Sequence, residues 1–127
     1  MRILHAGLGA SSEVKADKFF CELLGLAKHG PAVLPAGLCR EVFGIQRELQ
    51  VFNYQAEGLH FEVFIDPAFS RGLPAVVHTC LEVEGLDAFL ARCAEQGIVV
   101  SRTPKGAAWV IFISDLDGNR YELKERK

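Results

Sequence analysis

Two histidines and two glutamates occupy matching places in the two halves of this 127-residue chain. His5 lies in the apolar stretch that opens the first half, and His78 lies in a similar stretch that opens the second. Near the end of each half, Glu62 and Glu122 each follow an aromatic residue and precede an aliphatic one. Imidazole nitrogen and carboxylate oxygen together suit Zn, Ni, Co, Mn or Fe(II). The four side chains therefore suggest a divalent-metal site, unlike the cysteine-rich sites that structural zinc prefers.

Such a ligand set would leave two adjacent coordination positions open for water or substrate. Two neighbouring oxygens of one substrate could bind there, with the metal acting as a Lewis acid towards an enediolate-like charge. One of the two carboxylates, Glu62 or Glu122, could take a proton from the carbon next to the carbonyl. Isomerisation or epimerisation follows when that proton returns to another carbon or to the other face.

The elements that must position these residues also repeat. Each half is predicted to form a strand, a helix and three further strands, in which the last strand carries the glutamate. Gly25 and Gly97 are natural ends for the two helices. Asp117-Gly118-Asn119 predicts a tight turn before the strand of Glu122. By alternation and apolar periodicity we expect helices over 13–24 and 86–96 and strands over 2–8, 41–45, 48–54, 59–65, 75–83 and 98–101, with a closing hairpin from 109 to 124.

We expect one domain made of two modules, 1–66 and 75–127, joined by a linker rich in proline and glycine over 67–74. The second module is shorter than the first, and the difference falls in the middle. There the first module has its least regular stretch, residues 27–39, which we expect to be an edge strand followed by a loop. The longest apolar run, residues 107–113, predicts a buried strand.

Composition restricts the possible functions. The formal net charge of -2 provides no basic surface for nucleic acid, and no apolar run approaches the length of a bilayer span. The N-terminus leads directly into a strand, without the apolar region of a signal peptide. None of the four cysteines forms a C-x-x-C pair. We therefore expect a cytoplasmic protein with reduced cysteines that binds neither nucleic acid nor membranes.

Taken together, the pattern resembles the vicinal oxygen chelate superfamily, also called the glyoxalase/bleomycin-resistance/dioxygenase fold. The family usually ends in Asp-Pro-Asp-Gly, and Leu116 replaces that proline here. The resemblance covers nearly the whole chain. Its residues are Leu4-His5-Ala6-Gly7-Leu8, the helix with Phe19-Phe20 and Leu23-Leu24-Gly25, the stretch from His78 to Val83 and the ending from Asp115 to Leu123.

The resemblance implies an α+β fold in which two βαβββ modules form a curved mixed sheet around a cavity. It implies metal ligands at His5, Glu62, His78 and Glu122. That set is most like the one in bacterial-type glyoxalase I, which isomerises the hemithioacetal of methylglyoxal and glutathione. It also implies a homodimer in which the N-terminal pair of one subunit meets the C-terminal pair of the other, so that a small-molecule substrate binds between subunits.

Two positions depart from the glyoxalase I pattern. Gly9 stands where an arginine commonly helps to hold glutathione, and Asp66 stands where an asparagine is expected. Three other functions stay open. They are an epimerase of acyl thioesters, an Fe(II) dioxygenase that uses His5, His78 and Glu122, and a metal-free protein that binds and sequesters drugs such as bleomycin.

Overall fold

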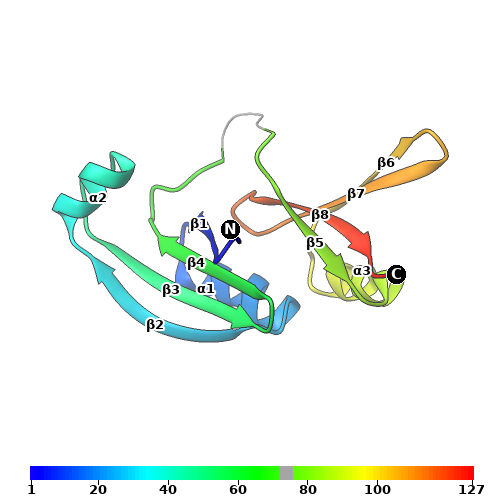
Figure 1. Ribbon diagram of the computed structural model, residues 1–127, viewed down its shortest axis with the longest axis horizontal. Coiled ribbons are helices and arrows are strands. Elements are labelled where there is room, and N and C mark those ends of the chain that lie inside the picture. The colour runs from blue at the N-terminus through cyan, green and yellow to red at the C-terminus, as the bar shows by residue number, and fades with distance from the viewer. Residues whose placement is uncertain (72–75) are drawn as a thin grey trace. The chain divides into compact units, whose positions relative to one another are not determined.

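A computed structural model describes residues 1–71 and 76–127. The chain divides into two compact units, Met1–Ser70 and Arg71–Lys127. Each unit contains one four-stranded sheet and its own helices (Figure 1). Residues 72–74 of the expected linker and Ala75 of the expected strand lie outside the described residues.

In unit 1 the strands lie in the order β1-β4-β3-β2, so that the first strand pairs with the last. β1 runs parallel to β4, whereas the other neighbours are antiparallel. β2 is the edge strand that the sequence predicts. The elements are β1 (Ala6–Ala10), α1 (Glu13–Asp17), the π-helix η1 (Lys18–Leu23), β2 (Ala27–Leu34), α2 (Ala36–Phe43), β3 (Leu49–Ala56) and β4 (Leu59–Ile65).

The helix formed by α1 and η1 covers one face of this sheet. Ser12 caps its N-terminus by accepting a hydrogen bond from the Lys15 backbone N–H at 3.2 Å. Phe20 stacks on Tyr54 with ring centroids 5.0 Å apart and contacts Phe61 at 5.3 Å. Successive strand residues point to opposite faces, so the residues on either side of Phe61 in β4 point away from this helix. Glu62 therefore lies on the face that this helix does not cover.

Unit 2 repeats the arrangement with the strand order β5-β8-β7-β6, in which β5 is parallel to β8. In the loop before β8, Gly118 has a φ of 86°, which L-residues rarely adopt, and the Asp115 carboxylate accepts backbone hydrogen bonds from Asp117 and Asn119. Tyr121 and Leu123 are buried, so Glu122 points to the opposite face. The elements are β5 (Thr79–Val83), α3 (Leu86–Glu95), β6 (Val100–Lys105), β7 (Ala108–Ser114) and β8 (Arg120–Glu125).

These observations confirm the α+β class and the two βαβββ modules. Glu62 is the fourth residue of β4 and Glu122 the third residue of β8, and both lie inside the parallel pairing with the first strand of their unit. In neither described range is there a helix long and apolar enough to cross a membrane.

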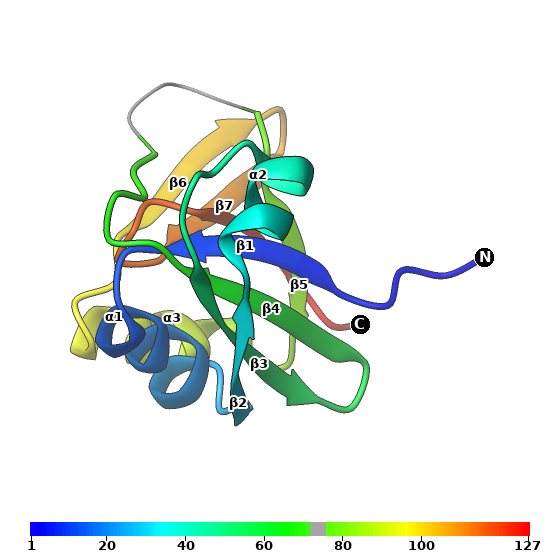
Figure 2. The same cartoon turned by 90° about the vertical axis from the view of Figure 1, so that its left-hand side faces the viewer.

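The strand expected over 41–45 is wrong, because residues 36–43 form helix α2 instead. Local composition favours a strand there, but tertiary contacts favour the helix. Cys39 is fully buried, and Phe43 packs on Phe64 of β4 with ring centroids 5.1 Å apart. In Figure 2, α2 lies apart from α1, beyond the end of β2. The loop expected after the edge strand is thus largely helical.

Several strand bounds also differ from the sequence prediction. β1 begins at Ala6 and β5 at Thr79, since pairing with the last strand of each unit starts there. His5 and His78 therefore precede their strands. β6 continues to Lys105, so the turn between β6 and β7 lies at residues 106–107. β7 is not wholly buried, and Trp109 is 63% exposed.

Candidate functional site

Unit 1 brings His5 and Glu62 together. Nε2 of His5 lies 3.2 Å from Oε2 of Glu62, and both side chains are partly exposed. The parallel register places Gly7 beside Glu62, so the residue two positions before Gly7 reaches the same face. His60 lies nearby, with its ring centroid 5.5 Å from that of His5 and its Nε2 2.7 Å from Oδ1 of Asn53. The first predicted pair therefore lies on the face of the sheet that the α1–η1 helix leaves open.

Unit 2 brings His78 and Glu122 together in the same way, with Nε2 and Oε2 3.5 Å apart. The other ring nitrogen, Nδ1, lies 2.7 Å from the Val76 carbonyl oxygen. A carbonyl only accepts, so Nδ1 donates the proton, and in a neutral ring Nε2 then keeps its lone pair. The ring of Phe112 packs edge-on against the imidazole at 5.2 Å. This orientation suits metal binding through Nε2.

Lys124 holds the Glu122 carboxylate in its charged form. Its Nζ lies 3.0 Å from Oε1, and this hydrogen bond, followed by the charges of Lys124 and His78, lowers the pKa of Glu122. Cys80 lies beside Glu122 in the parallel register. Burial and the charge of Glu122 raise the pKa of the Cys80 thiol, so it is a poor nucleophile at neutral pH.

The four predicted ligands thus come together two by two. Within either unit, the described residues bring no three His, Cys, Asp or Glu side chains together as a metal cluster. One imidazole and one carboxylate bind a metal weakly by themselves. The chemistry of the donors nevertheless fits a divalent ion of the Mn-to-Zn series once two such pairs share it. The described residues of either unit therefore offer two of the four predicted ligands.

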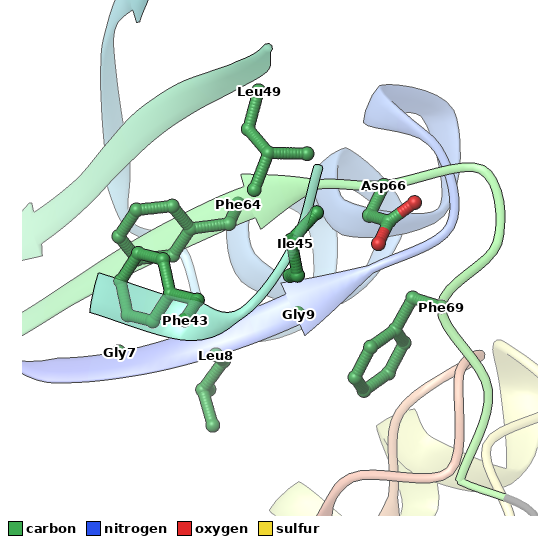
Figure 3. Close-up of a pocket in the computed structure, with 9 residues that line it drawn as sticks. All are labelled: Gly7, Leu8, Gly9, Phe43, Ile45, Leu49, Phe64, Asp66 and Phe69. Carbon is green, nitrogen blue, oxygen red and sulfur yellow. The ribbon is translucent and has the colours of Figure 1, made fainter. Parts of the chain in front are cut away.

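A cavity of about 350 Å³ lies wholly within unit 1 (Figure 3), and one of its lining residues, Gly7, is the register partner of Glu62. Gly7 and Gly9 of β1 form one wall, and Phe43 and Ile45, at the end of α2 and beyond it, form another. The sequence prediction missed this cavity because it placed a strand where α2 lies. The available signal was the pair of glycines that alternate on β1 next to the glutamate strand.

A second cavity of about 250 Å³ lies beside the other pair in unit 2. His78, Phe112 and Arg120 line it. Arg120 forms no ion pair with any residue that the structure describes, and it shares a face of β8 with Glu122. The sequence prediction did not single out Arg120, although its spacing of two from Glu122 on a strand was visible.

The two departures from the glyoxalase I pattern have structural counterparts. A Cβ atom at Gly9 would lie 2.4 Å from the ring of Phe69, so a side chain there requires that ring to move. Asp66 is buried and accepts hydrogen bonds from Arg47, including 2.9 Å from Nε and 2.6 Å from Nη2. Neither position offers a partner for a glutathione carboxylate.

No protein-family model matches the sequence, and no curated protein matches it. Solved structures do match. The glyoxalase family protein from Enterococcus faecalis superposes with a TM-score of 0.74 at 21% identity, covering 96% of this chain and 95% of that one. A glyoxylase/bleomycin resistance protein/dioxygenase domain from Frankia sp. EAN1pec gives 0.74 at 14% identity, covering 100% and 93%. The chain has the vicinal oxygen chelate fold.

The same fold occurs in the fosfomycin resistance protein FosX from Listeria monocytogenes. The structure of a Glu-to-Gln variant of FosX, complexed with Mn(II) and 1S,2S-dihydroxypropylphosphonic acid, superposes with a TM-score of 0.71 at 15% identity and covers 96% of this chain and 87% of that one. At such identities the likeness establishes the fold.

Proposed function

We propose that this chain is a divalent-metal-dependent enzyme whose metal ligands are His5, Glu62, His78 and Glu122. The observation that carries the proposal is the repeated pair of one histidine and one glutamate, with Nε2–Oε2 distances of 3.2 and 3.5 Å, at equivalent places of two units. A pair that served only stability would not need the same two residue types twice. The Mn(II) in the FosX structure supports the choice of a metal on this fold.

The reaction that we propose is a proton transfer of the glyoxalase I type, a lyase and isomerase chemistry. A bound divalent ion would supply Lewis-acid stabilisation of charge on two neighbouring substrate oxygens. The chain would supply the proton carrier, Glu62 or Glu122, next to the carbon whose proton moves. The Val76 carbonyl keeps His78 in the orientation for binding. Because the glutathione partners are missing, we expect a hemithioacetal of a small neutral thiol to react better than one of glutathione.

We also propose that the working form is a homodimer, in which the His5–Glu62 pair of one protomer meets the His78–Glu122 pair of its partner. Apolar side chains directly before each histidine support this. Ile3 is 91% exposed and Leu4 67% exposed, and Val76 and Val77 are 91% and 61% exposed. Such neighbouring apolar side chains are typical of surfaces that another chain covers.

Metal content tests the enzyme proposal directly. Purified protein that is reloaded with Ni, Co, Zn, Mn or Fe(II) should hold about one ion per chain, measured by elemental analysis. Protein that takes up none of these ions contradicts the proposal and favours the metal-free drug-binding alternative. Oxygen uptake with catechols under Fe(II) would instead identify a dioxygenase, and exchange of the α-proton of an acyl thioester in D2O would identify an epimerase.

Mixing two inactive variants tests whether each metal site is formed by two chains or by one. His5→Ala and His78→Ala proteins should each be inactive. Mixed dimers of the two variants should regain about half of the wild-type turnover per dimer, since one of their two sites keeps both histidines. A site made within a single chain predicts no recovery, because each chain of the mixture lacks one histidine.

A second candidate function is water addition to an epoxide of a phosphonic acid, which would give a diol like the one in the FosX structure. The observation that favours it is Arg120, a free cation among the described residues that lines the same cavity as His78. Guanidinium groups bind phosphonate oxygens well. Phosphorus NMR of fosfomycin incubated with Mn(II)-loaded protein tests it. An unchanged spectrum after incubation excludes this reaction.

A further inference from the structure

We propose that the cavity of unit 1 binds an apolar substituent of the substrate, an aryl or branched alkyl group, rather than a charged one. The inference rests on the proposed function, since it names the substrate class of that site. It uses features that the metal ligands do not need, namely two glycines, a ring of aromatics and an ion pair.

The cavity is lined by the strand neighbours of Glu62, although Glu62 and His5 are not among its lining residues. Gly7 is the neighbour of Glu62 in the parallel register, and Phe64 lies two residues beyond Glu62 on the same face. Gly7 and Phe64 both line the cavity. A substrate whose reacting oxygens lie near Glu62 would therefore extend its remaining part along β1. At about 350 Å³, the volume falls within the usual range for small-molecule sites.

Missing side chains on β1 create this space. Gly7 has a backbone conformation that any residue can adopt, and a Cβ atom there would meet only the edge of Phe64, at 3.6 Å. Nothing in the backbone therefore requires glycine at this position. Its effect is to leave room above the strand, and at Gly9 the ring of Phe69 occupies part of the same room.

The opposite wall comes from α2 and the residues after it. Phe43 lies edge-on to Phe64, and Figure 3 shows both rings beside the strand. Phe43 is 47% exposed, which is costly for an aromatic ring unless something covers it. An apolar group in the cavity would cover part of that surface.

Charge decides between an apolar and a polar occupant. Among the described residues that line the cavity, Asp66 is the one with a charge. Its carboxylate is fully engaged by the guanidinium of Arg47 and the backbone N–H of Ala68 at 2.9 Å. These described lining residues therefore offer neither a free cation for a carboxylate nor a free carboxylate for an amine. The walls therefore select a group without charge.

The first test needs no metal, so it stands apart from the proposed function. Metal-free protein is titrated with toluene while the methyl signals of Ile45 and Leu49 are followed by NMR. We expect saturable shifts in the wild type, loss of these shifts in Gly7→Val and in Ile45→Trp, which fill the cavity from opposite walls, and wild-type shifts in Gly37→Val. Gly37 is the matched control, because it does not line the cavity and a Cβ atom added there would meet no atom within 4 Å.

The second test uses Mn(II)-loaded protein and two chelators that differ in one substituent, benzohydroxamate and acetohydroxamate. We expect the phenyl compound to bind at least about tenfold more tightly, and Gly7→Val and Ile45→Trp to remove this preference. Equal affinity for both chelators in the wild type, or a preference that survives both filling variants, overturns the inference but leaves the metal site intact. Toluene binding without any chelator binding overturns the proposed metal function but leaves the apolar site intact.

Discussion

The two units share a topology but differ in what connects their middle strands. In unit 1, residues 35–48 join β2 to β3 and include α2, whereas in unit 2 only Gly106 and Ala107 join β6 to β7. The end of α2 forms one wall of the apolar cavity in unit 1, whereas the tight turn of unit 2 lies at the opposite end of β7 from Ser114, the register partner of Arg120. The repeated parts carry the proposed ligands. The cavity of unit 1 therefore belongs to the part of the fold that the two units do not share.

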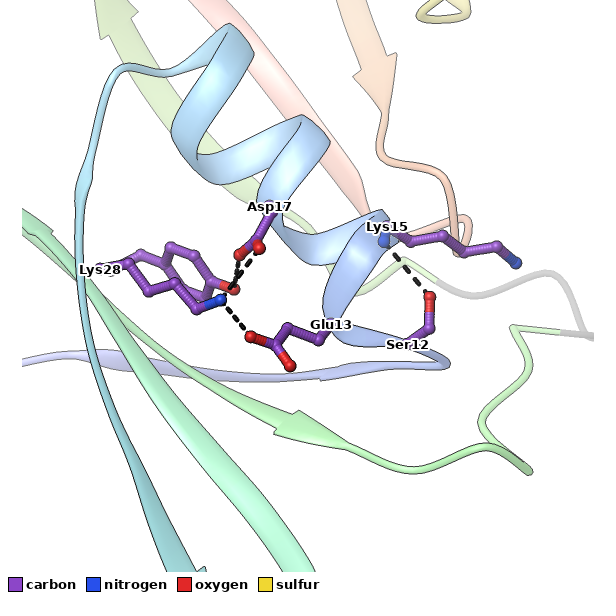
Figure 4. Close-up of polar contacts among 6 residues, drawn as sticks. Ser12, Glu13, Lys15, Asp17 and Lys28 are labelled. Atoms are coloured by element: carbon purple, nitrogen blue, oxygen red, sulfur yellow. Dashed lines mark hydrogen bonds and ion pairs between the residues drawn. The ribbon is translucent and has the colours of Figure 1, made fainter.

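Each unit also anchors a buried tyrosine to an aspartate, but in different surroundings. Tyr54 donates a hydrogen bond to Asp17 at 2.8 Å, and the partly exposed Asp17 also accepts one from Nζ of Lys28 at 2.9 Å (Figure 4). Tyr121 donates to Asp115 at 3.0 Å inside the loop before β8, where burial raises the pKa of Asp115. The first contact ties a helix to a sheet, and the second holds the strand that carries Glu122.

The largest expected effect tests whether the two glutamates are equivalent. Glu62→Gln and Glu122→Gln should each lower turnover by roughly 10²–10⁴-fold, because a positioned proton carrier contributes about that much. The variant that keeps its metal while losing turnover identifies the proton carrier, and the one that loses metal identifies a ligand. His29→Ala, an exposed edge-strand change, is the control. Full turnover in either glutamine variant contradicts the role of that residue.

Removing each tyrosine hydroxyl should lower the free energy of unfolding, and by a larger amount in unit 2 than in unit 1. Tyr121→Phe should lower the free energy of unfolding by about 1.5–3 kcal/mol, since a buried carboxylate loses a donor. Tyr54→Phe should lower it by about 0.5–1.5 kcal/mol, because the partly exposed Asp17 keeps its hydrogen bond from Lys28. Urea denaturation followed by circular dichroism measures both. The reverse order would mean that the Tyr54–Asp17 contact matters more than the Tyr121–Asp115 contact.

The segment that joins β2 to β3 and the turn that joins β6 to β7 can be compared by adding one methyl group to each. Gly106 has a φ of 62°, so Gly106→Ala should cost about 1–2 kcal/mol. Gly37 in α2 has an ordinary helical conformation with open space around it, so Gly37→Ala should stabilise by about 0.4–1 kcal/mol. Thermal denaturation gives both values. A loss of stability at Gly37 would show that α2 is not the helix described.

The smallest effect concerns Asp66 at the end of the cavity. The hydrogen bonds from Arg47 hold the pKa of the Asp66 carboxyl below its usual value, against the opposing effect of burial. This stabilisation is present above the unfolded-state pKa of about 3.9 and is lost as pH falls through the lower folded-state value. The wild type should therefore lose more stability than Arg47→Gln does on going from pH 7 to below pH 4.

Arg40→Gln is the matched control for this comparison, because Arg40 pairs with Glu41 at 3.7 Å on the exposed surface of α2. It should leave the pH dependence of the urea midpoint unchanged. Identical pH profiles for Arg47→Gln and the wild type would show that the ion pair does not stabilise the loop after β4.

Local chemistry was enough for the sequence to predict the modules. Alternation along β4 and β8 placed Glu62 and Glu122 opposite the buried residues, and glycine marked the helix ends. The repeat of histidine and glutamate predicted a metal site that stays a prediction until metal is measured. The structure adds that each histidine lies beside the glutamate of its own unit.

Only the tertiary structure decided where α2 lies, where β1 and β5 begin, and that a cavity exists beside Glu62. Helix and strand propensities are short-range, and for residues 36–43 they were overruled by the burial of Cys39 and the contact of Phe43 with Phe64. Strand ends depend on a pairing partner more than 50 residues away in β4, as Ala6 opposite Phe61 shows. Periodicity encodes which face a side chain takes, whereas a cavity depends on which distant side chains fail to fill the space above it.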